Sequence, residues 1–319
     1  MKVFRILLMV LAALMAAPSG AQEPASSKRI AFTFDDVPRA ADVLYTQDER
    51  TRRLIEGLKQ AGVEQAAFFL NPKNIPTNKG AEARIAAYVD AGHVIANHTF
   101  SHPWLSQVTA QEYLGDLDKG AAWFEGREGT RPWFRYPFLD EGRDDKAKRD
   151  TVREGLARRG LANAYVTVDA SDWFYEGALE TATREGQAID RAALSTLFIE
   201  SHVEAAEFYA DLAQRTLGRQ PAHVMLMHEN DLTALTLVDL VDTLKAKGWR
   251  IITVDEAYAD PVAVEASRYD TPSAGGTLIE QLAWQRGPPA PRWYSRNDTR
   301  LAQAEFRKRV LGGEDNSED

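Results

Sequence analysis

Residues 29–36 have the sequence RIAFTFDD, and this stretch determines how the rest of the chain is interpreted. Its apolar alternation predicts a buried β-strand, which ends at two adjacent carboxylates, Asp35 and Asp36. Like charges at the end of a buried strand repel each other and resist removal from water. The fold must therefore bring compensating positive charge to this strand end.

Short β-like segments alternate with amphipathic, helix-like segments from residue 29 to residue 258. Strands are expected at 29–34, 65–70, 93–98, 133–138, 164–170, 223–228 and 250–257. Helices are expected at 48–60, 80–90, 110–125, 145–159, 187–217 and 235–247. This alternation predicts an α/β fold with parallel strands and right-handed crossovers. An open doubly wound sheet and a TIM-type barrel both fit, and the barrel is favoured because no Gly-rich phosphate loop follows the first strand.

The chain of 319 residues can bury a large core, as one big domain or as two smaller ones. Residues 1–21 are interpreted as a signal peptide, with a basic start, a short apolar run and small residues at the cleavage position. A membrane anchor is the alternative, but the apolar run is shorter than the roughly 20 residues that a spanning helix needs. Residues 22–260 are assigned to a single barrel domain with a helical insertion at 174–222. Residues 261–319 are assigned to a C-terminal extension that loses the regular pattern and ends in a solvated tail.

The composition excludes several kinds of site. The sequence has no cysteine, so disulfides, thiolate nucleophiles and thiolate metal ligands are absent and any metal must bind histidine and carboxylate. The formal net charge of −9 disfavours long-range attraction to nucleic acid or to anionic membranes. We therefore expect no nucleic-acid partner, and no stable membrane insertion after the signal peptide is cleaved.

Polar residues gather where the predicted strands end. They are Asp35 and Asp36 after the first strand, His98 after the third, Arg135 near the end of the fourth, Asp169 and Asp172 after the fifth, and His228 after the sixth. In a parallel α/β barrel these strand ends converge on one face. The sequence therefore predicts one site built from all of these segments.

The segment 98–102, HTFSH, favours a metal centre at that face. Its spacing puts the imidazoles of His98 and His102 on one side of a tight turn or helical start. Two neutral imidazoles and one carboxylate give a divalent cation three ligands and leave a position open for water. One aspartate of the Asp35–Asp36 pair would then bind the cation, while the other is free to accept a proton.

Three other residues make sense in the same site, although each has an ordinary structural interpretation on its own. Arg135 fits a buried ion pair, His228 a core histidine and Trp173 a core filler. Together they suggest that Asp172 orients and charges His228 while Arg135 holds a catalytic aspartate.

The motifs TFDD, HTFSH, RYPF, DASDW and LMH match, in order and approximate spacing, the five motifs of the polysaccharide deacetylases, the NodB-homology carbohydrate esterases. The resemblance covers residues 29–258. It implies a distorted (β/α)7 barrel and metal-dependent removal of acetyl groups from N-acetylated sugars. Two departures occur in the third motif, where Tyr136 replaces a common Pro and Phe138 replaces the usual Tyr.

The resemblance also implies roles for the motif residues. Asp35 resembles the catalytic base, while Asp36, His98 and His102 resemble the ligands of a divalent metal, Zn²⁺ in the first place, with Co²⁺ or Ni²⁺ as alternatives. By the same resemblance, Arg135 would orient the base, and the Phe138 backbone N–H would form the oxyanion hole. His228 would donate a proton with the support of Asp172, and Trp173 and Leu226 would line the acetyl pocket.

The expected substrate is an N-acetylated amino-sugar polymer, such as peptidoglycan, a chitin-like chain or an exported polysaccharide, met in the periplasm or outside the cell. Sugar rings could stack on the aromatic residues near the motif ends, which are Trp104, Trp133, Trp173 and Phe174, and core packing is the alternative. A metal-dependent amidase acting on a small amide fits the same residues. A non-catalytic carbohydrate-binding barrel is the third alternative, and it would predict broken motifs.

Overall fold

The computed structural model describes residues 28–313. The expected signal peptide at 1–21 and the last residues of the tail lie outside this range. Within it, no helix combines the length and the apolar character needed to cross a bilayer.

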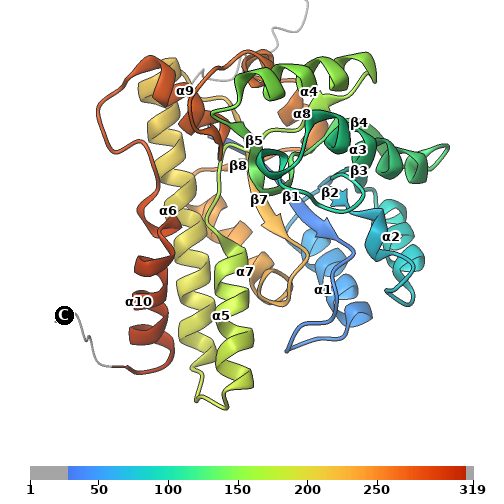
Figure 1. The fold of residues 1–319 in the computed structure, drawn as a ribbon. Helices are drawn as coiled ribbons and strands as arrows, with labels where there is room; N and C mark the ends of the chain where they lie inside the picture. The colour runs from blue at the N-terminus through green and yellow to red at the C-terminus, as the bar shows by residue number, and fades with distance from the viewer. Residues whose placement is uncertain (1–27, 314–319) are drawn as a thin grey trace, which may run out of the picture.

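The core of the fold is one parallel sheet (Figure 1). Its strands are β1 (Arg29–Val37), β2 (Ala67–Leu70), β3 (Val94–Asn97), β4 (Thr130–Phe134), β6 (Ala162–Asn163), β7 (Ala222–His228) and β8 (Arg250–Ile251). They pair in the order β6-β4-β3-β2-β1-β7, and β8 pairs with the start of β1. A separate antiparallel pair consists of β5 (Asp140–Arg143) and β9 (Ala274–Gly275).

The sheet curls until its two ends meet. After β6 the chain runs on to Val168, which forms an isolated parallel bridge with Met225 of β7. The backbone N–H of Leu226 donates to the carbonyl of Val168 at 2.9 Å, so the segment after β6 closes the sheet onto β7. The predicted distorted (β/α)7 barrel is therefore confirmed, and the open doubly wound sheet is not what forms.

Helices surround this curled sheet. They are α1 (Gln47–Gln60), α2 (Ala81–Asp90), α3 (Ala110–Phe124), α4 (Lys146–Arg158), α5 (Asp172–Arg184), α6 (Arg191–Leu217), α7 (Asp231–Ala246), α8 (Val254–Tyr258), α9 (Leu278–Arg286) and α10 (Thr299–Val310). Side-chain caps begin several of them, and α3 starts with a full capping box between Thr109 and Glu112. The caps place the helix starts within a few residues of the predicted positions.

Two predicted strands are shorter than the sequence suggested. The segment 164–170 contributes only a bridge at Val168, and the segment 250–257 contains a two-residue strand followed by a helix. The hydroxyl of Thr253 accepts the backbone N–H of Glu256 and so begins α8. A helix cap therefore outweighs the apolar run that favoured a longer strand.

The prediction that regular structure is lost after residue 261 is wrong. The extension contains α9 and α10, and α9 begins with a capping box between Thr277 and Glu280. Figure 1 shows α10 lying beside α5 and α6 on one flank of the molecule. Phe306 and Val310 on α10 are buried in the same hydrophobic cluster as the strands. The insertion and the extension thus complete the core of the barrel.

We expect Phe306→Ala to lower the free energy of unfolding by about 3–5 kcal/mol, because it empties a fully buried site. Leu301→Ala on the same helix is the matched control, since Leu301 is 50% exposed, and should change stability by less than about 0.5 kcal/mol. Urea unfolding of the two variants measures the difference. Equal losses in both would show that α10 does not belong to the core.

Candidate active site

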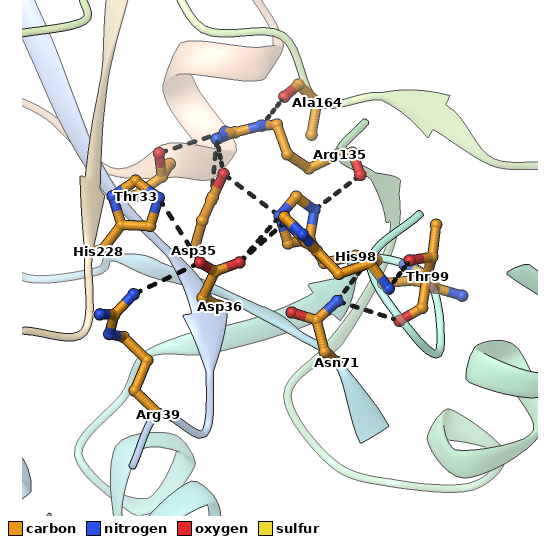
Figure 2. Close-up of polar contacts among 12 residues, drawn as sticks. Thr33, Asp35, Asp36, Arg39, Asn71, His98, Thr99, Arg135, Ala164 and His228 are labelled. Carbon is orange, nitrogen blue, oxygen red and sulfur yellow. Dashed lines mark hydrogen bonds and ion pairs between the residues drawn. The ribbon is translucent and has the colours of Figure 1, made fainter. Parts of the chain in front are cut away.

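The carboxyl ends of the parallel strands bring the predicted residues together, as Figure 2 shows. Asp35 and Asp36 lie at the end of β1, and Asp35 is in register with His228 at the end of β7. His98 directly follows β3, and Arg135 directly follows β4. Four strands thus deliver side chains to one small volume.

Three of these side chains form a group suited to a metal ion. Nε2 of His102 lies 3.0 Å from Oδ1 of Asp36, and Nε2 of His98 lies 3.6 Å from the same oxygen. The two Nε2 atoms are 3.2 Å apart. A tetrahedral site with bonds of about 2.0–2.1 Å separates its ligand atoms by roughly 3.3 Å, so the spacing fits a metal centre.

The bonding around this group supports the same conclusion. Asp36 Oδ1 is buried and has no hydrogen-bond partner among residues 28–313. His98 Nδ1 faces the carbonyl of Arg135 at 2.8 Å, which leaves Nε2 directed at Asp36. Burial holds the pKa of His98 well below its usual value, so its imidazole is neutral. The donor set of one carboxylate and two imidazoles therefore fits a divalent cation.

The backbone is strained where it presents these ligands. Asp36, Thr99 and His102 have φ values of 66°, 66° and 61°, in the left-handed region that non-glycine residues seldom occupy. Asn71 Nδ2 donates to the carbonyl of His98 at 2.6 Å, and the Thr99 N–H donates to Asn97 Oδ1 at 2.7 Å. These amide contacts hold the ligand loop in a conformation that costs about 1–3 kcal/mol per residue.

Gly120 on α3 permits the same loop to approach closely. A Cβ at this position would lie 3.0 Å from the backbone of Thr99 and Phe100 and from Asn97 Oδ1. Such a distance is tighter than ordinary packing allows, so the helix can lie against the His98 loop only with glycine here.

Asp35 has a different partner. Arg135 Nη1 lies 3.0 Å from both of its carboxyl oxygens, and Nη2 of the same guanidinium donates to Thr33 Oγ1 and to the Tyr258 hydroxyl. Arg135 Nε also donates to the carbonyl of Ala164. Burial raises the pKa of Asp35, and the charge of Arg135 opposes that rise. Asp35 is thus a fixed, desolvated carboxyl beside the metal-binding group.

His228 is held by Asp172, as the sequence suggested. Its Nδ1 lies 2.7 Å from Asp172 Oδ1, while Asp172 Oδ2 accepts the His228 backbone N–H and the Asn230 amide. Burial alone would lower the pKa of His228, but the Asp172 carboxylate outweighs it and raises the value to about 9. Nε2 of His228 lies 3.9 Å from Asp36 Oδ2, so a protonated imidazole faces the site.

Aromatic residues border the metal-binding group. The ring of Phe138 stacks on Trp104 at a centroid distance of 3.7 Å, and its edge meets His102 at 4.3 Å. Phe138 has a φ of 57° and is 44% exposed. Trp173, directly after Asp172, is 49% exposed and is therefore not a core filler, and it lines a separate cavity between α5 and α10 with Gly177 and Gln303. Leu226 is buried on β7, two residues before His228 and so on the same face of the strand.

Other residues that the sequence singled out serve the fold. Trp133 is buried in one hydrophobic cluster, and Phe174 is partly buried against another. The carboxyl of Asp169 accepts the Ser171 N–H, so it caps the turn before α5 and does not bind His228. Tyr136 is buried in a hydrophobic cluster with Tyr113 and Phe134, away from the metal-binding group.

Several supporting residues were not identified from the sequence. Thr33 and Tyr258 hold Arg135, and Asn71, Asn97 and Gly120 hold the His98 loop. Thr33 lies within the TFDD motif, where its position two residues before Asp35 on the strand places it on the same face. For Asn71, Gly120 and Tyr258 the sequence carries no signal, because their partners are distant along the chain, whereas Asn97 holds Thr99 only two residues on.

Comparison with known proteins agrees with this geometry. The family model described as polysaccharide deacetylase matches residues 22–159, which contain the Asp35–Asp36 pair, both metal-binding histidines and Arg135. Residues 22–159 are thus similar to the polysaccharide deacetylases. The chain is 31% identical to a peptidoglycan-N-acetylglucosamine deacetylase of Bacillus cereus over 150 residues, which are 47% of this chain and 48% of that protein.

Other relatives extend the match along the chain. A peptidoglycan-N-acetylglucosamine deacetylase of Listeria monocytogenes is 24% identical over 77% of this chain and 42% of its own length. A chitin deacetylase of Colletotrichum lindemuthianum is 24% identical over 72% of this chain and 79% of its own length. The chain thus spans less than half of the first two curated relatives. A pseudoenzyme of the same esterase family from Bacillus anthracis shares the fold, with a TM-score of 0.51 at 20% identity over 73% of this chain and 66% of its own.

We expect His98→Ala, His102→Ala and Asp36→Asn each to weaken Zn²⁺ binding by more than about 100-fold, because each removes a ligand and even outer contacts contribute about 10–100-fold. Asp35→Asn should retain the metal, since Asp35 pairs with Arg135. Calorimetric titration of metal-free protein and elemental analysis measure both effects. Undiminished affinity in the two histidine variants would contradict the assignment.

Proposed function

We propose that the protein is a metal-dependent hydrolase that removes N-acetyl groups from an N-acetylated amino-sugar polymer. The observation that carries this proposal is the arrangement of Asp36, His98 and His102 around one point, with Asp35 on one side and His228 on the other. A base, a metal-ligand group and a proton donor are the parts that hydrolysis of an amide requires.

Asp36, His98 and His102 would hold the metal, for which Zn²⁺ is the first choice and Co²⁺ or Ni²⁺ the alternatives. A divalent metal bound there supplies Lewis acidity toward water and toward the amide carbonyl. These ligands include no thiolate, and their imidazoles suit borderline cations.

Asp35 is the proposed general base. Its Oδ2 lies 3.8 Å from Nε2 of His98, so it borders the metal-ligand group without joining it. Burial raises its pKa, which makes the carboxylate a stronger base, and Arg135 keeps it oriented. Asp35 would accept the proton of the attacking water.

His228 is the proposed general acid. An amine leaves poorly unless it is protonated, and the pKa of His228, raised to about 9 by Asp172, keeps a proton available on Nε2. The Phe138 backbone N–H is the proposed oxyanion donor, presented by a left-handed residue beside His102. Loss of such a donor typically costs about 100- to 1,000-fold in rate.

The surroundings of the site favour a sugar substrate. A cavity of about 400 Å³ opens from Asp36 and His102 and is lined by Asn71, Asn74, Thr77 and Asn78, among others. Amide and hydroxyl side chains suit sugar hydroxyls, whereas a small-amide amidase would need a narrower pocket. The stacked Trp104–Phe138 pair offers a flat apolar face to a sugar ring, and Trp173 and Leu226 would line the acetyl pocket.

The names of the relatives narrow the choice of the polymer substrate. Peptidoglycan N-acetylglucosamine and chitin are the substrates that the curated relatives are named for. The signal-peptide pattern at residues 1–21 agrees with export, so we place the reaction in the periplasm or outside the cell. Peptidoglycan or another exported N-acetylated polymer is therefore the proposed substrate.

Asp35→Asn should lower kcat for deacetylation by about 100- to 10,000-fold while the metal stays bound, because it removes the proton acceptor. Asp144→Asn is the matched control, since Asp144 belongs to a second Asp-Asp pair that is exposed on the surface. Acetate release and metal content are measured on the same samples. An Asp35→Asn enzyme with full activity would exclude Asp35 as the base.

The substrate class is tested by measuring acetate release from chitooligosaccharides and peptidoglycan fragments. Small linear and cyclic amides are assayed in parallel for release of acetate and ammonia. We expect acetate from the sugar polymers and little turnover of the small amides. Ammonia from the small amides with no acetate from any sugar would favour the amidase. No turnover of any substrate by metal-loaded protein would favour a non-catalytic barrel, as in the Bacillus anthracis pseudoenzyme.

A further inference from the structure

A second group of acidic side chains lies outside the metal-binding site. It consists of Asp42, in the loop between β1 and α1, and of Glu176 and Glu180 on α5, and we call it the Asp42 cluster. One carboxyl oxygen from each residue lies within 4.8 Å of the others. Glu176 and Glu180 are spaced four residues apart on one helix face, where like charges destabilise each other.

Glu176 indicates that the Asp42 cluster is a ligand site. The residue is only 1% exposed. Its Oε2 accepts the backbone N–H of Leu232 at 2.9 Å, but its Oε1 is buried without a hydrogen-bond partner among the described residues. A proton on this oxygen would need a neighbouring carboxyl of the cluster as its acceptor, and it would neutralise only one of the carboxyls. A bound cation would satisfy this oxygen.

The nearby arginines compensate only part of the negative charge. Arg50 Nη1 lies 2.7 Å from Asp42 Oδ2 and 3.3 Å from Asp231 Oδ1. The charge of Arg39 is shared between this cluster and Asp36, whose Oδ2 lies 3.5 Å from Arg39 Nη1. Two guanidinium groups thus face four carboxyls, namely Asp42, Asp231, Glu176 and Glu180, besides Asp36.

The titration behaviour agrees with an excess of negative charge. Burial raises the pKa of Glu176 to about 8, and the neighbouring Asp42 and Asp231 raise it further. Burial also raises the pKa of Asp42 to about 6, and contact with the Glu180 carboxyl contributes. Carboxyls in such surroundings must take up either a proton or a cation.

We propose that Asp42, Glu176 and Glu180 bind a hard divalent cation, Ca²⁺ or Mg²⁺, at a site separate from the Asp36–His98–His102 group. All three ligands are carboxyl oxygens, and oxygen-only donor sets select hard cations over Zn²⁺. A Ca²⁺ ion with bonds of about 2.4 Å spans ligand oxygens up to about 4.8 Å apart, which covers the observed separations.

The cation would fasten two parts of the active site to each other. Asp42 lies in the loop that leaves β1 just after Asp35 and Asp36, and it also lines the 400 Å³ cavity beside the metal-binding group. Glu176 and Glu180 follow Asp172 on the same face of α5, four and eight residues on. A bridge between the loop and α5 would hold one wall of the cavity in place relative to His228.

The test uses metal-free full-length protein reloaded with one equivalent of Zn²⁺ and then titrated with CaCl₂ or MgCl₂ at constant ionic strength. Calorimetry should show one further cation per chain. At a concentration about 100 times Kd, the midpoint of thermal unfolding should rise by roughly 5 °C. Glu176→Gln and Glu180→Gln should weaken this binding at least about tenfold and leave the Zn²⁺ content unchanged.

Two controls separate this site from the catalytic one. Glu185→Gln, at the exposed C-terminal end of α5, should bind Ca²⁺ like the unaltered protein. His98→Ala should lose Zn²⁺ but keep the Ca²⁺ response, whether or not the protein proves to be a deacetylase. If Glu176→Gln does not fold, Glu180→Gln provides the test, because the Glu180 side chain is more exposed. A midpoint that neither cation moves, or an equal response in Glu180→Gln, would overturn the proposal.

Discussion

The site depends on the compensation of two adjacent carboxylates at the end of a buried strand. Asp35 and Asp36 leave β1 together, yet their partners come from different places in the chain. Arg135 from the end of β4 holds Asp35, whereas the imidazoles of His98 and His102 face Asp36. Asp36 Oδ2 also lies 3.5 Å from Arg39 Nη1 and 3.9 Å from Nε2 of the protonated His228. Without these partners the end of β1 would carry two uncompensated buried charges, which a fold of ordinary stability does not tolerate.

Arg135 links the charge compensation of Asp35 to residues of the core. Its guanidinium also contacts Thr33, Tyr258 and the carbonyl of Ala164, which lie on β1, at the end of α8 and after β6. Its own carbonyl accepts from His98 Nδ1 and so fixes which nitrogen of that ring faces Asp36. One residue thus positions the proposed base Asp35 through its side chain and the proposed metal ligand His98 through its backbone. Position 135 therefore joins the two halves of the site.

The sequence alone predicted those parts of the structure that depend on patterns of neighbouring residues. Alternating strands, helix caps and the polar residues at strand ends predicted the barrel and brought Asp35, Asp36, His98, His102, Arg135, Asp172 and His228 to one face. It was not sufficient for the C-terminal extension, because Phe306 and Val310 are apolar residues whose burial depends on α5 and α6, far away along the chain. The supports Asn71 and Tyr258 escaped notice for the same reason. Each acts through a partner at least 27 residues distant, and nothing in its own neighbourhood marks it.

The two adjacent aspartates have the same side chain but differ in the direction of their pKa shifts. Burial raises the pKa of Asp35, and a single guanidinium only partly offsets it. Burial acts on Asp36 as well, but His102 and His228 lower its pKa far below the usual range. The first carboxyl therefore has a high affinity for a proton, and the second stays ionised and available to a cation. Successive side chains of β1 point to opposite faces, and the backbone turns left-handed at Asp36. Asp35 could therefore take the surroundings of Asp36, and Asp36 those of Asp35, only if the backbone followed a different path. The geometry of the strand end thus makes the two aspartates different, which is what the proposed roles of base for Asp35 and metal ligand for Asp36 require.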